Sequence, residues 1–398
     1  MSHARELLDG QAPGRESNRR RLITEIMIKS DRQSRIARRT GLSQATVSAS
    51  IQELAELGVV ETDKAVDGLG KSRGGRVRLR PLSGVAVGID LGFNHVSVIV
   101  RQVDHPFERV AWRRGASGAN TGLRRLLPEV RELIREAVDE TGQTMADIVS
   151  AGVAVPRMVE PRTGRFTTPV LPPWELGDDP AAEFTAMLGV PVAMDNDANL
   201  GAMAEQIYGA DEPVEHIVYV KASTGVGVGI MIGSTLLRGQ RGMAGELGHL
   251  MMNPDGEMCL CGGRGCLDTI VGAESLVAKI KQAQRGTSRP VPSDLGALIQ
   301  SAHTGDAVCV RILNDAGRVL GLALAQLCNL INPRCVVIGG QLAEARHLLI
   351  EPCGQELSRF ALPGTVGQAD FELRISALSP FAEAQGALVL GLRSRASK

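Results

Sequence analysis

The sequence lacks the features that would place the chain in or across a membrane. Its first six residues, MSHARE, contain no apolar core of a signal peptide. Its apolar run at residues 320–331 is shorter than a bilayer span and contains Gln326 and Asn329. We therefore expect no membrane partner, and we expect a cytoplasmic protein.

The chain also has no net charge and few cysteines. The 398 residues include 44 basic and 44 acidic side chains, and a hydrophobic fraction of 43% is enough to fill globular cores. The length predicts two to four domains. Three of the seven cysteines lie within residues 259–266, a spacing that favours a metal site over a disulfide framework.

The charges are unevenly distributed along the chain. Residues 1–80 hold 16 Lys and Arg side chains against 10 Asp and Glu, whereas residues 81–398 hold 28 against 34. Only the first segment has the excess of positive charge that favours an anionic partner.

The basic segment, residues 1–80, contains a helix-turn-helix pattern. Apolar residues at helical spacing predict a helix from Ser17 and a second helix around Ile36. Gly41 can adopt the left-handed backbone of a tight turn, and Ser43 can cap a third helix, expected from about Gln44 to Leu57. The small and polar faces of that helix suit a major groove. The residues expected to contact DNA from it are Ser43, Gln44, Ala45, Thr46 and Ser48.

Two short strands are expected after the third helix. Residues 59–62 predict one strand, and the alternating residues 76–80 predict its partner, with a glycine-rich loop between them. Arg73 and Arg76 would carry positive charge to phosphates or into a narrow minor groove, as in the wing of a winged helix-turn-helix domain. A three-helix protein-interaction module with a solvated basic loop is the alternative.

The rest of the chain contains two similar strand-turn-strand segments. Residues 85–100 pass through Asp90 and Gly92, and residues 217–232 pass through Thr224 and Gly225. Glycines in such turns let phosphates approach backbone N–H groups. The repetition predicts a duplicated fold with a nucleotide cleft between its halves.

A polar segment, residues 194–199, lies between these repeats and opens a predicted helix. Asp197 could accept a hydroxyl proton there during phosphoryl transfer. An ordinary helix N-cap is the alternative, and the simpler one for this segment taken alone.

The clustered cysteines and a preceding histidine form the pattern H-x9-C-x-C-x4-C. One imidazole and three thiolates complete a tetrahedral Zn²⁺ site without a water position, so we expect a structural zinc. Its ligands would be His249, Cys259, Cys261 and Cys266. Three buried thiols beside an unrelated histidine are the alternative. The other cysteines are expected in the core: Cys309, Cys328, Cys335 and Cys353.

These motifs resemble the ROK family of repressors, open reading frames and sugar kinases. Residues 245–249 (GELGH) and 259–268 (CLCGGRGCLD) look like its signature, and the resemblance extends over nearly the whole chain. It implies an α/β fold, in which a winged helix-turn-helix precedes a two-lobed, actin-like ATPase (ribonuclease H-like) body.

The resemblance also implies domain boundaries. Residues 1–80 would form the DNA-binding domain, and residues 81–195 the first lobe, which a carboxy-terminal helix in residues 381–398 completes. Residues 196–380 would form the second lobe, with the zinc loop and the dimerisation surface.

By the same resemblance, a group of polar residues would bind sugar hydroxyls. This group is Asn196, Asp197, Glu246, His249 and Asp268. Asp197 would be the catalytic base if the chain were a kinase. His249 would use one nitrogen for zinc and present the other side of its ring to the sugar.

Several residues depart from the pattern of the family's kinases. Phe93-Asn94-His95 replaces small, phosphate-binding residues, Arg157 stands where glycine is common, and Asp268 is one methylene shorter than the usual Glu. We therefore expect Asp90, Gly92, Thr224 and Gly225 to be remnants of phosphate loops, and little or no kinase activity.

The sequence as a whole predicts a sugar-responsive, DNA-binding transcriptional regulator, most simply a repressor that a carbohydrate releases. We expect a homo-oligomer, a dimer or a tetramer, whose paired DNA-binding domains bind a palindromic operator. Two alternatives are a ROK carbohydrate kinase that also binds DNA and a ROK regulator without a sugar ligand.

Overall fold

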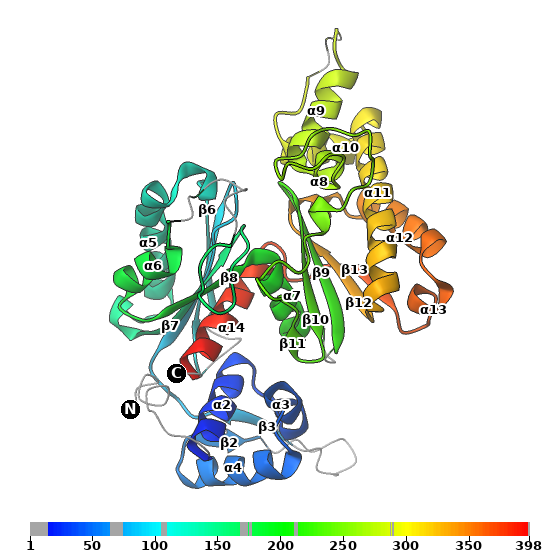
Figure 1. Ribbon diagram of the computed structural model, residues 1–398. Coiled ribbons are helices and arrows are strands. Elements are labelled where there is room, and N and C mark those ends of the chain that lie inside the picture. The colour runs from blue at the N-terminus through cyan, green and yellow to red at the C-terminus, as the bar shows by residue number, and fades with distance from the viewer. Residues whose placement is uncertain are drawn as a thin grey trace. The chain divides into compact units, whose positions relative to one another are not determined.

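The chain folds into two compact units (Figure 1). The computed structural model describes residues 15–63, 75–104, 110–167, 174, 177–210, 214–286, 288 and 290–396. The first unit comprises residues 1–156, 173–195 and 384–398, and the second comprises residues 157–172 and 196–383. Within the described ranges, every helix is too short or too polar to cross a bilayer.

Three helices and a small sheet form the amino-terminal part of the first unit, which we call the head (residues 15–80). The helices are α2 (Arg15–Ile28), α3 (Gln33–Thr40) and α4 (Gln44–Glu56). The antiparallel sheet has the order β1-β3-β2, with β1 (Asp31–Arg32), β2 (Val60–Thr62) and β3 (Arg76–Leu79).

The turn between α3 and α4 forms as the sequence predicts. Gly41 has φ +66°, and Ser43 Oγ accepts a hydrogen bond from the Thr46 amide at 3.1 Å. On α4, Val47, Ile51 and Leu54 are buried in the core of the head. The burial of this one face leaves the opposite side of α4 open to solvent.

A five-stranded sheet with the order β6-β5-β4-β7-β8 forms the centre of the first unit. Its strands are β4 (Val85–Asp90), β5 (Val96–Gln102), β6 (Val110–Gly115), β7 (Ile148–Val155) and β8 (Val192–Asn196). The central strand β4 pairs antiparallel with β5 and parallel with β7. The helical elements are η1 (Ala119–Thr121), α5 (Leu123–Glu140), η2 (Met145–Asp147), α6 (Pro180–Leu188) and the carboxy-terminal helix α14 (Ala382–Ala396).

Helix α14 packs directly on the first sheet, where two strands carry glycine. A Cβ atom on Gly88 of β4 would overlap the Ala384 carbonyl oxygen, and one on Gly152 of β7 would overlap that of Ala387. The helix backbone therefore lies against the strand backbones, a contact that requires glycine. Residues far apart in the chain thus meet in this unit.

The sheet of the second unit has the order β11-β10-β9-β12-β13. Its strands are β9 (His216–Ala222), β10 (Val226–Ile232), β11 (Thr235–Leu236), β12 (Cys335–Gly339) and β13 (Glu372–Ile375). The central β9 pairs antiparallel with β10 and parallel with β12, which is the pattern of β4 in the first unit. The repeated pairing agrees with the duplicated fold that the two strand-turn-strand segments predict.

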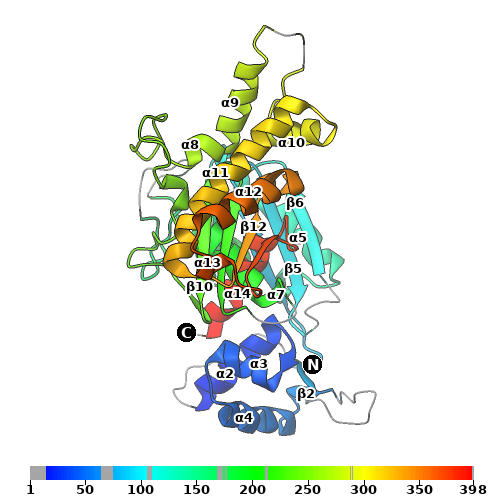
Figure 2. The ribbon, with the colours of Figure 1, turned by 90° about the vertical axis from the view of Figure 1, so that its right-hand side faces the viewer.

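Helices cover both faces of the second sheet. Helix α7 (Asp197–Tyr208) packs on β9 and β10, and α11 (Ala307–Ile331) lies beside α12 (His347–Phe360) in the main core (Figure 2). The remaining elements are η3 (Leu247–His249), α8 (Asp268–Val271), α9 (Ala273–Ala283), α10 (Leu295–His303), η4 (Gln341–Ala345) and α13 (Pro363–Val366).

Four cysteines lie in the interior of the second unit, as the sequence predicts. Each is at most 1% exposed: Cys309, Cys328, Cys335 and Cys353. Burial raises the pKa of the Cys328 thiol to about 12. These thiols therefore stay protonated at neutral pH and behave as small apolar side chains.

Candidate metal centre and polar cluster

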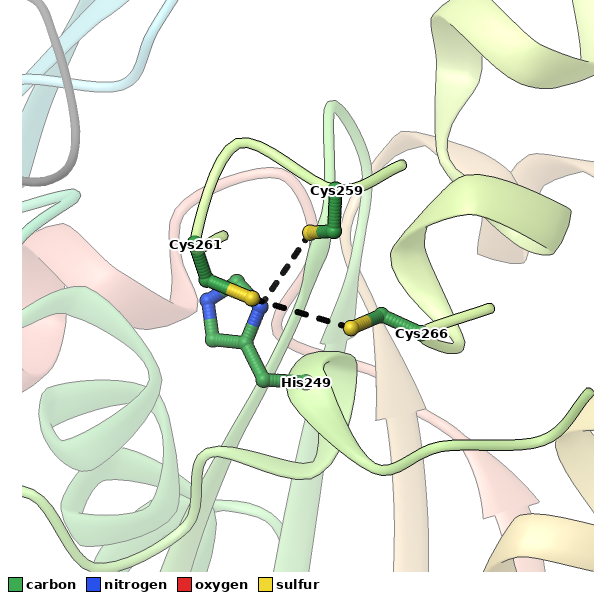
Figure 3. Close-up of side chains that lie close together, drawn as sticks. All are labelled: His249, Cys259, Cys261 and Cys266. Atoms are coloured by element: carbon green, nitrogen blue, oxygen red, sulfur yellow. Dashed lines mark hydrogen bonds between the residues drawn. The ribbon is translucent and has the colours of Figure 1, made fainter. Parts of the chain in front are cut away.

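The four predicted metal ligands converge in the second unit (Figure 3). His249 ends the short helix η3, Cys259 and Cys261 lie on the loop that follows, and Cys266 is buried just before α8. Their ligand atoms all lie within 4.8 Å of one another. The cluster could therefore bind a metal ion.

The spacing of these atoms fits a tetrahedral site. With Zn–S bonds of about 2.3 Å and a Zn–N bond of about 2.0 Å, tetrahedral angles place two sulfurs about 3.8 Å apart and a sulfur and a nitrogen about 3.5 Å apart. The Cys261 and Cys266 Sγ atoms are 3.7 Å apart, and Cys259 Sγ lies 3.6 Å from His249 Nδ1. The side chains thus already surround the position of an ion.

Backbone pairing fixes the loop that carries the thiols. Met251 bridges to Cys266 and Met258 bridges to Arg264, so the loop doubles back on itself. The Gly263 amide also donates to Cys261 Sγ at 3.4 Å. An amide donor directed at sulfur favours the thiolate that a metal requires.

The residues expected to bind sugar hydroxyls also lie together, and we call them the polar cluster (Asn196, Asp197, Glu246, His249 and Asp268). Asn196 caps helix α7, where its Oδ1 accepts the Ala198 and Asn199 amides, and its Nδ2 donates to the Arg157 carbonyl oxygen at 3.3 Å. The N-cap interpretation therefore holds for Asn196, while Asp197 begins the helix itself.

Glu246 connects the polar cluster to the metal ligands. Its Oε2 lies 4.0 Å from His249 Nε2, while the other ring nitrogen of His249 faces Cys259. Burial, together with the charges of Asp197 and Asp268, raises the pKa of Glu246 to about 7. One histidine ring thus lies between the thiols and the carboxylates.

Asp268 turns toward the second glycine-rich loop. Its Oδ1 accepts the Val226 amide at 2.7 Å, and its carboxylate lies against Gly225. Burial raises the pKa of Asp268, although the Val226 amide and His249 act in the opposite direction. The loop that carries Thr224 and Gly225 therefore already holds one carboxylate of the chain itself.

Lys221 also contacts the polar cluster, although no sequence motif singles it out. It lies near the end of strand β9, is 8% exposed, and its Nζ donates to Asp197 Oδ2 at 2.8 Å. Glu383 Oε1 lies 3.8 Å from the same ammonium and accepts the Tyr219 hydroxyl at 2.8 Å. A lysine at the end of the apolar run Ile217–Val220 was the available signal, because lysine is almost never buried without a partner.

The first glycine-rich loop contains a second such pair. His95 Nε2 lies 3.0 Å from Asp90 Oδ2, and Asp90 is fully buried. The His95 ring fills the space beside Gly92, where a Cβ atom would overlap it. The sequence predicts that residues 93–95 disturb this loop, and the structure identifies His95 as the side chain that fills it.

Arg157, which stands where glycine is common in the family's kinases, is 1% exposed. Its guanidinium stacks over Phe166, 4.4 Å from the ring centroid. Its carbonyl oxygen accepts from Asn196, so its backbone helps to position the polar cluster.

The residues expected to contact DNA lie on the outside of the head. Ser43, Gln44, Ala45 and Ser48 are exposed on α4 or at its cap, Thr46 is half-buried, and Arg76 is exposed at the start of β3. Arg73 lies outside the described residues. The exposed side chains form the side of α4 opposite the apolar core.

Comparison with known proteins places the chain in a family. The model of the ROK family matches residues 86–394. A putative xylose repressor of Caldicellulosiruptor sp. (strain Rt8B.4) is 30% identical over 334 residues, which cover 80% of this chain and 81% of that protein. The chain therefore belongs to the ROK family.

Solved structures show the fold. A ROK family transcriptional regulator, a homologue of the E. coli MLC protein, superposes with a TM-score of 0.71 at 21% identity and covers 96% of this chain and 97% of its own. A ROK glucokinase from Streptomyces griseus, with glucose and AMPPNP, superposes with a TM-score of 0.68 at 24% identity and covers 78% of this chain and 100% of its own. The body therefore has the actin-like ATPase fold.

Proposed function

We propose that this protein is a cytoplasmic transcriptional repressor whose affinity for operator DNA falls when a sugar binds to the polar cluster. Residues 1–80 would be its winged helix-turn-helix, and the two lobes of the body would form its sensor. A relative named as a xylose repressor and a full-length match to a ROK regulator support this proposal.

The ion pair between Lys221 and Asp197 carries the choice of a sensor over a kinase. A catalytic base needs a carboxylate oxygen directed at the hydroxyl that will attack. Here the Lys221 ammonium donates a hydrogen bond to Asp197 Oδ2, and the Ala198 amide donates one to Oδ1 at 2.7 Å. Each oxygen still has a lone pair for a hydroxyl donor. The arrangement therefore suits binding a sugar better than deprotonating it.

The first glycine-rich loop supports the same choice. Phosphoryl transfer depends on positioning and on stabilising the charge of the phosphate. The His95 ring beside Gly92 and the buried Asp90 carboxylate occupy that loop with side chains of the chain itself. Sugar binding at the polar cluster makes no such demand on the loop.

We assign the metal as zinc, with a structural role. Three thiolates and one imidazole are a ligand set that zinc favours, and they leave no position for a substrate. When bound, the ion supplies a fixed cross-link between η3 and the loop that carries Cys259 and Cys261. His249 and Glu246 lie on or next to η3, so the loop would hold both for hydroxyl binding.

The head would bind DNA through α4 and the segment that ends at β3. The first residues of a recognition helix reach base edges, a role that suits Gln44 and Ser48. Arg73 and Arg76 would contact phosphates or the minor groove. A homo-oligomer with two heads related by symmetry would bind a palindromic operator.

A DNA-release assay tests this function. A fluorescent duplex from upstream of the gene for this chain is titrated with protein alone and with D-xylose, D-glucose or N-acetylglucosamine. We expect specific binding that one sugar weakens, and weakening by that sugar to be lost in Asp197→Asn. The matched control Asp255→Asn, on an exposed loop, should respond as the parent does. Binding that no sugar changes would contradict the proposal.

A further inference from the structure

A buried set of charges connects the polar cluster to the start of helix α14. Lys221 Nζ lies 2.8 Å from Asp197 and 3.8 Å from Glu383, and the side chains of all three residues are at most 9% exposed. Glu383 stands in the first turn of α14 and belongs to the second unit, while the helix from Ala384 onward belongs to the first. One ammonium thus lies between a residue of the polar cluster and the helix that joins the two units.

Tyr219 holds Glu383 in a fixed position. Its hydroxyl donates to Glu383 Oε1 at 2.8 Å, and its ring has no room to move. Gly201 and Gly339 lie so close to the ring that a Cβ atom on either would overlap it. Because the Tyr219 ring cannot move aside, Glu383 is held in place beside Lys221. We therefore expect a change in the partners of Lys221 to act on Glu383 directly.

The far end of α14 contacts the head. Arg393 Nε, in the last turn, donates to Glu25 Oε1 of α2 at 2.8 Å, and Glu25 is 4% exposed. Burial raises the pKa of Glu25, but Arg393 and Arg39 outweigh it and hold that pKa below its usual value. Both views show α14 ending beside α2 (Figures 1 and 2).

Glu25 in turn positions the helices that lead to α4. Arg39 of α3 donates to Glu25 Oε2 at 3.1 Å and to the Lys29 carbonyl oxygen at 2.7 Å. Arg39 lies two residues before Gly41, the turn into α4. The contact at Arg393 is therefore two side chains away from the start of the helix proposed to recognise DNA.

A second arginine holds α2 against the first sheet. Arg101 of β5 is 3% exposed and donates to the carbonyl oxygens of Met27 and Ile28 at 2.8 and 3.0 Å. The last carbonyl groups of a helix have no partner within it, so this guanidinium caps α2. The head thus contacts the same sheet on which α14 packs.

We propose that Lys221 is a positioning residue that passes occupancy of the polar cluster to helix α14, and that the contact of Arg393 with Glu25 passes it on to the head. A sugar hydroxyl that donates to Asp197 Oδ2 shares that oxygen with the ammonium and weakens the ion pair. Lys221 then shifts toward Glu383, its other partner. The inference rests on the proposed function and explains how a sugar at the polar cluster, whose residues all belong to the second unit, changes DNA binding by the head.

Thermodynamic coupling is the quantity that tests this route. It is the ratio of the DNA dissociation constants with and without saturating sugar, and values of about 5 to 150 are typical of allosteric proteins. The ratio is measured with the upstream duplex and the sugar that weakens binding by the parent. Glu383→Gln keeps an acceptor for Tyr219 and removes the charge, and Arg393→Gln removes the contact with Glu25.

We expect both variants to lower the coupling ratio to less than about threefold. Each variant should keep its sugar affinity and its sugar-free DNA affinity within about threefold of the parent. If Glu383 and Arg393 only stabilised the fold, their loss would lower these affinities as well. The matched control is Arg135→Gln on the surface of α5, which removes an arginine from exposed ion pairs with Glu132 and Asp139 and should leave coupling unchanged.

Different experimental outcomes would contradict the proposed route and the proposed function. A parent whose DNA binding no sugar alters would overturn the proposed function and this route with it. Parent-like coupling in both variants would overturn the route alone. Loss of sugar-free DNA binding in Arg393→Gln would also overturn it, because the contact would then only hold the head together. Lys221→Met, which removes the ammonium, should uncouple the two sites in the same way as Glu383→Gln.

Discussion

The two units each hold a buried carboxylate with a basic side chain, but they do so by different means. In the first unit, His95 contacts Asp90 from the same turn, five residues along the chain. In the second, Lys221 reaches Asp197 from a strand 24 residues away. The first pair is local, whereas the second exists only because α7 packs on β9.

The difference shows in burial as well as in sequence distance. The His95 side chain is 21% exposed, and that of Lys221 is 9% exposed and has a second acidic neighbour, Glu383. Buried pairs are expensive to break, because the remaining charge has no water around it. Loss of Lys221 would leave two acidic side chains, Asp197 and Glu383, without their cation, whereas loss of His95 would leave only Asp90.

The largest expected effect is on the metal content of the second unit. Cys261→Ser should reduce zinc from one ion per chain to nearly none, because a structural site with four ligands does not tolerate the loss of a thiolate. The expected loss of order should be confined to the second unit. Metal analysis of the purified protein checks this, and Cys309→Ala, a buried thiol outside the cluster, is the control. Unchanged zinc in Cys261→Ser would refute the assignment.

Breaking each carboxylate pair should destabilise the protein unequally. Lys221→Met leaves two buried carboxylates without their cation and should lower the free energy of unfolding by about 3 to 5 kcal/mol. His95→Gln removes a partly exposed partner and should cost about 1 kcal/mol. Denaturant unfolding of both variants measures the two costs. Equal losses would show that burial does not distinguish the pairs.

Sugar affinity should depend on the second unit alone. Asp197→Asn replaces a charged acceptor, and hydrogen bonds to charged groups contribute about 1.5 to 3 kcal/mol, so affinity should fall roughly tenfold or more. The same change removes the charge that holds Lys221, so the proposed route also predicts weaker DNA binding without sugar. Calorimetric titration with the sugar that releases DNA provides the first value, and anisotropy provides the second. Parent-like sugar affinity would place the ligand elsewhere.

The smallest expected effect lies in the head. Arg76→Ala should reduce the slope of log K against log salt by about 0.9, which corresponds to one phosphate contact. Gln44→Ala should instead change the preferred sequence and keep the slope. Both variants should bind sugar as the parent does, because they alter only the first unit. A salt series in which Arg76→Ala matches the parent would remove this arginine from the interface.

Local patterns predicted the helices and the turn of the head. The cap at Ser43, the turn at Gly41 and the apolar face of α4 each depend on a few neighbouring residues, and all three are present. The four metal ligands were also predictable, because they lie close together in the sequence, from His249 to Cys266. Short sequence separation leaves few conformations that bring such groups together.

Contacts across the fold were not predictable in the same way. Nothing local in the sequence pairs Lys221 with Asp197, or Arg393 with Glu25 at a separation of 368 residues. Such partners depend on which faces of the helices and strands pack together. A basic residue in an apolar strand indicates a buried partner but does not identify it.

Binding and turnover measured on the same sample test whether the polar cluster binds sugar without phosphorylating it. The protein is mixed with ATP, Mg²⁺ and the sugar that releases DNA, and ADP formation is followed alongside a calorimetric binding curve. We expect a clear binding curve and a rate of ADP formation no higher than the rate without sugar. ADP formation at about 1 to 100 per second, the usual range for kinases, would contradict it.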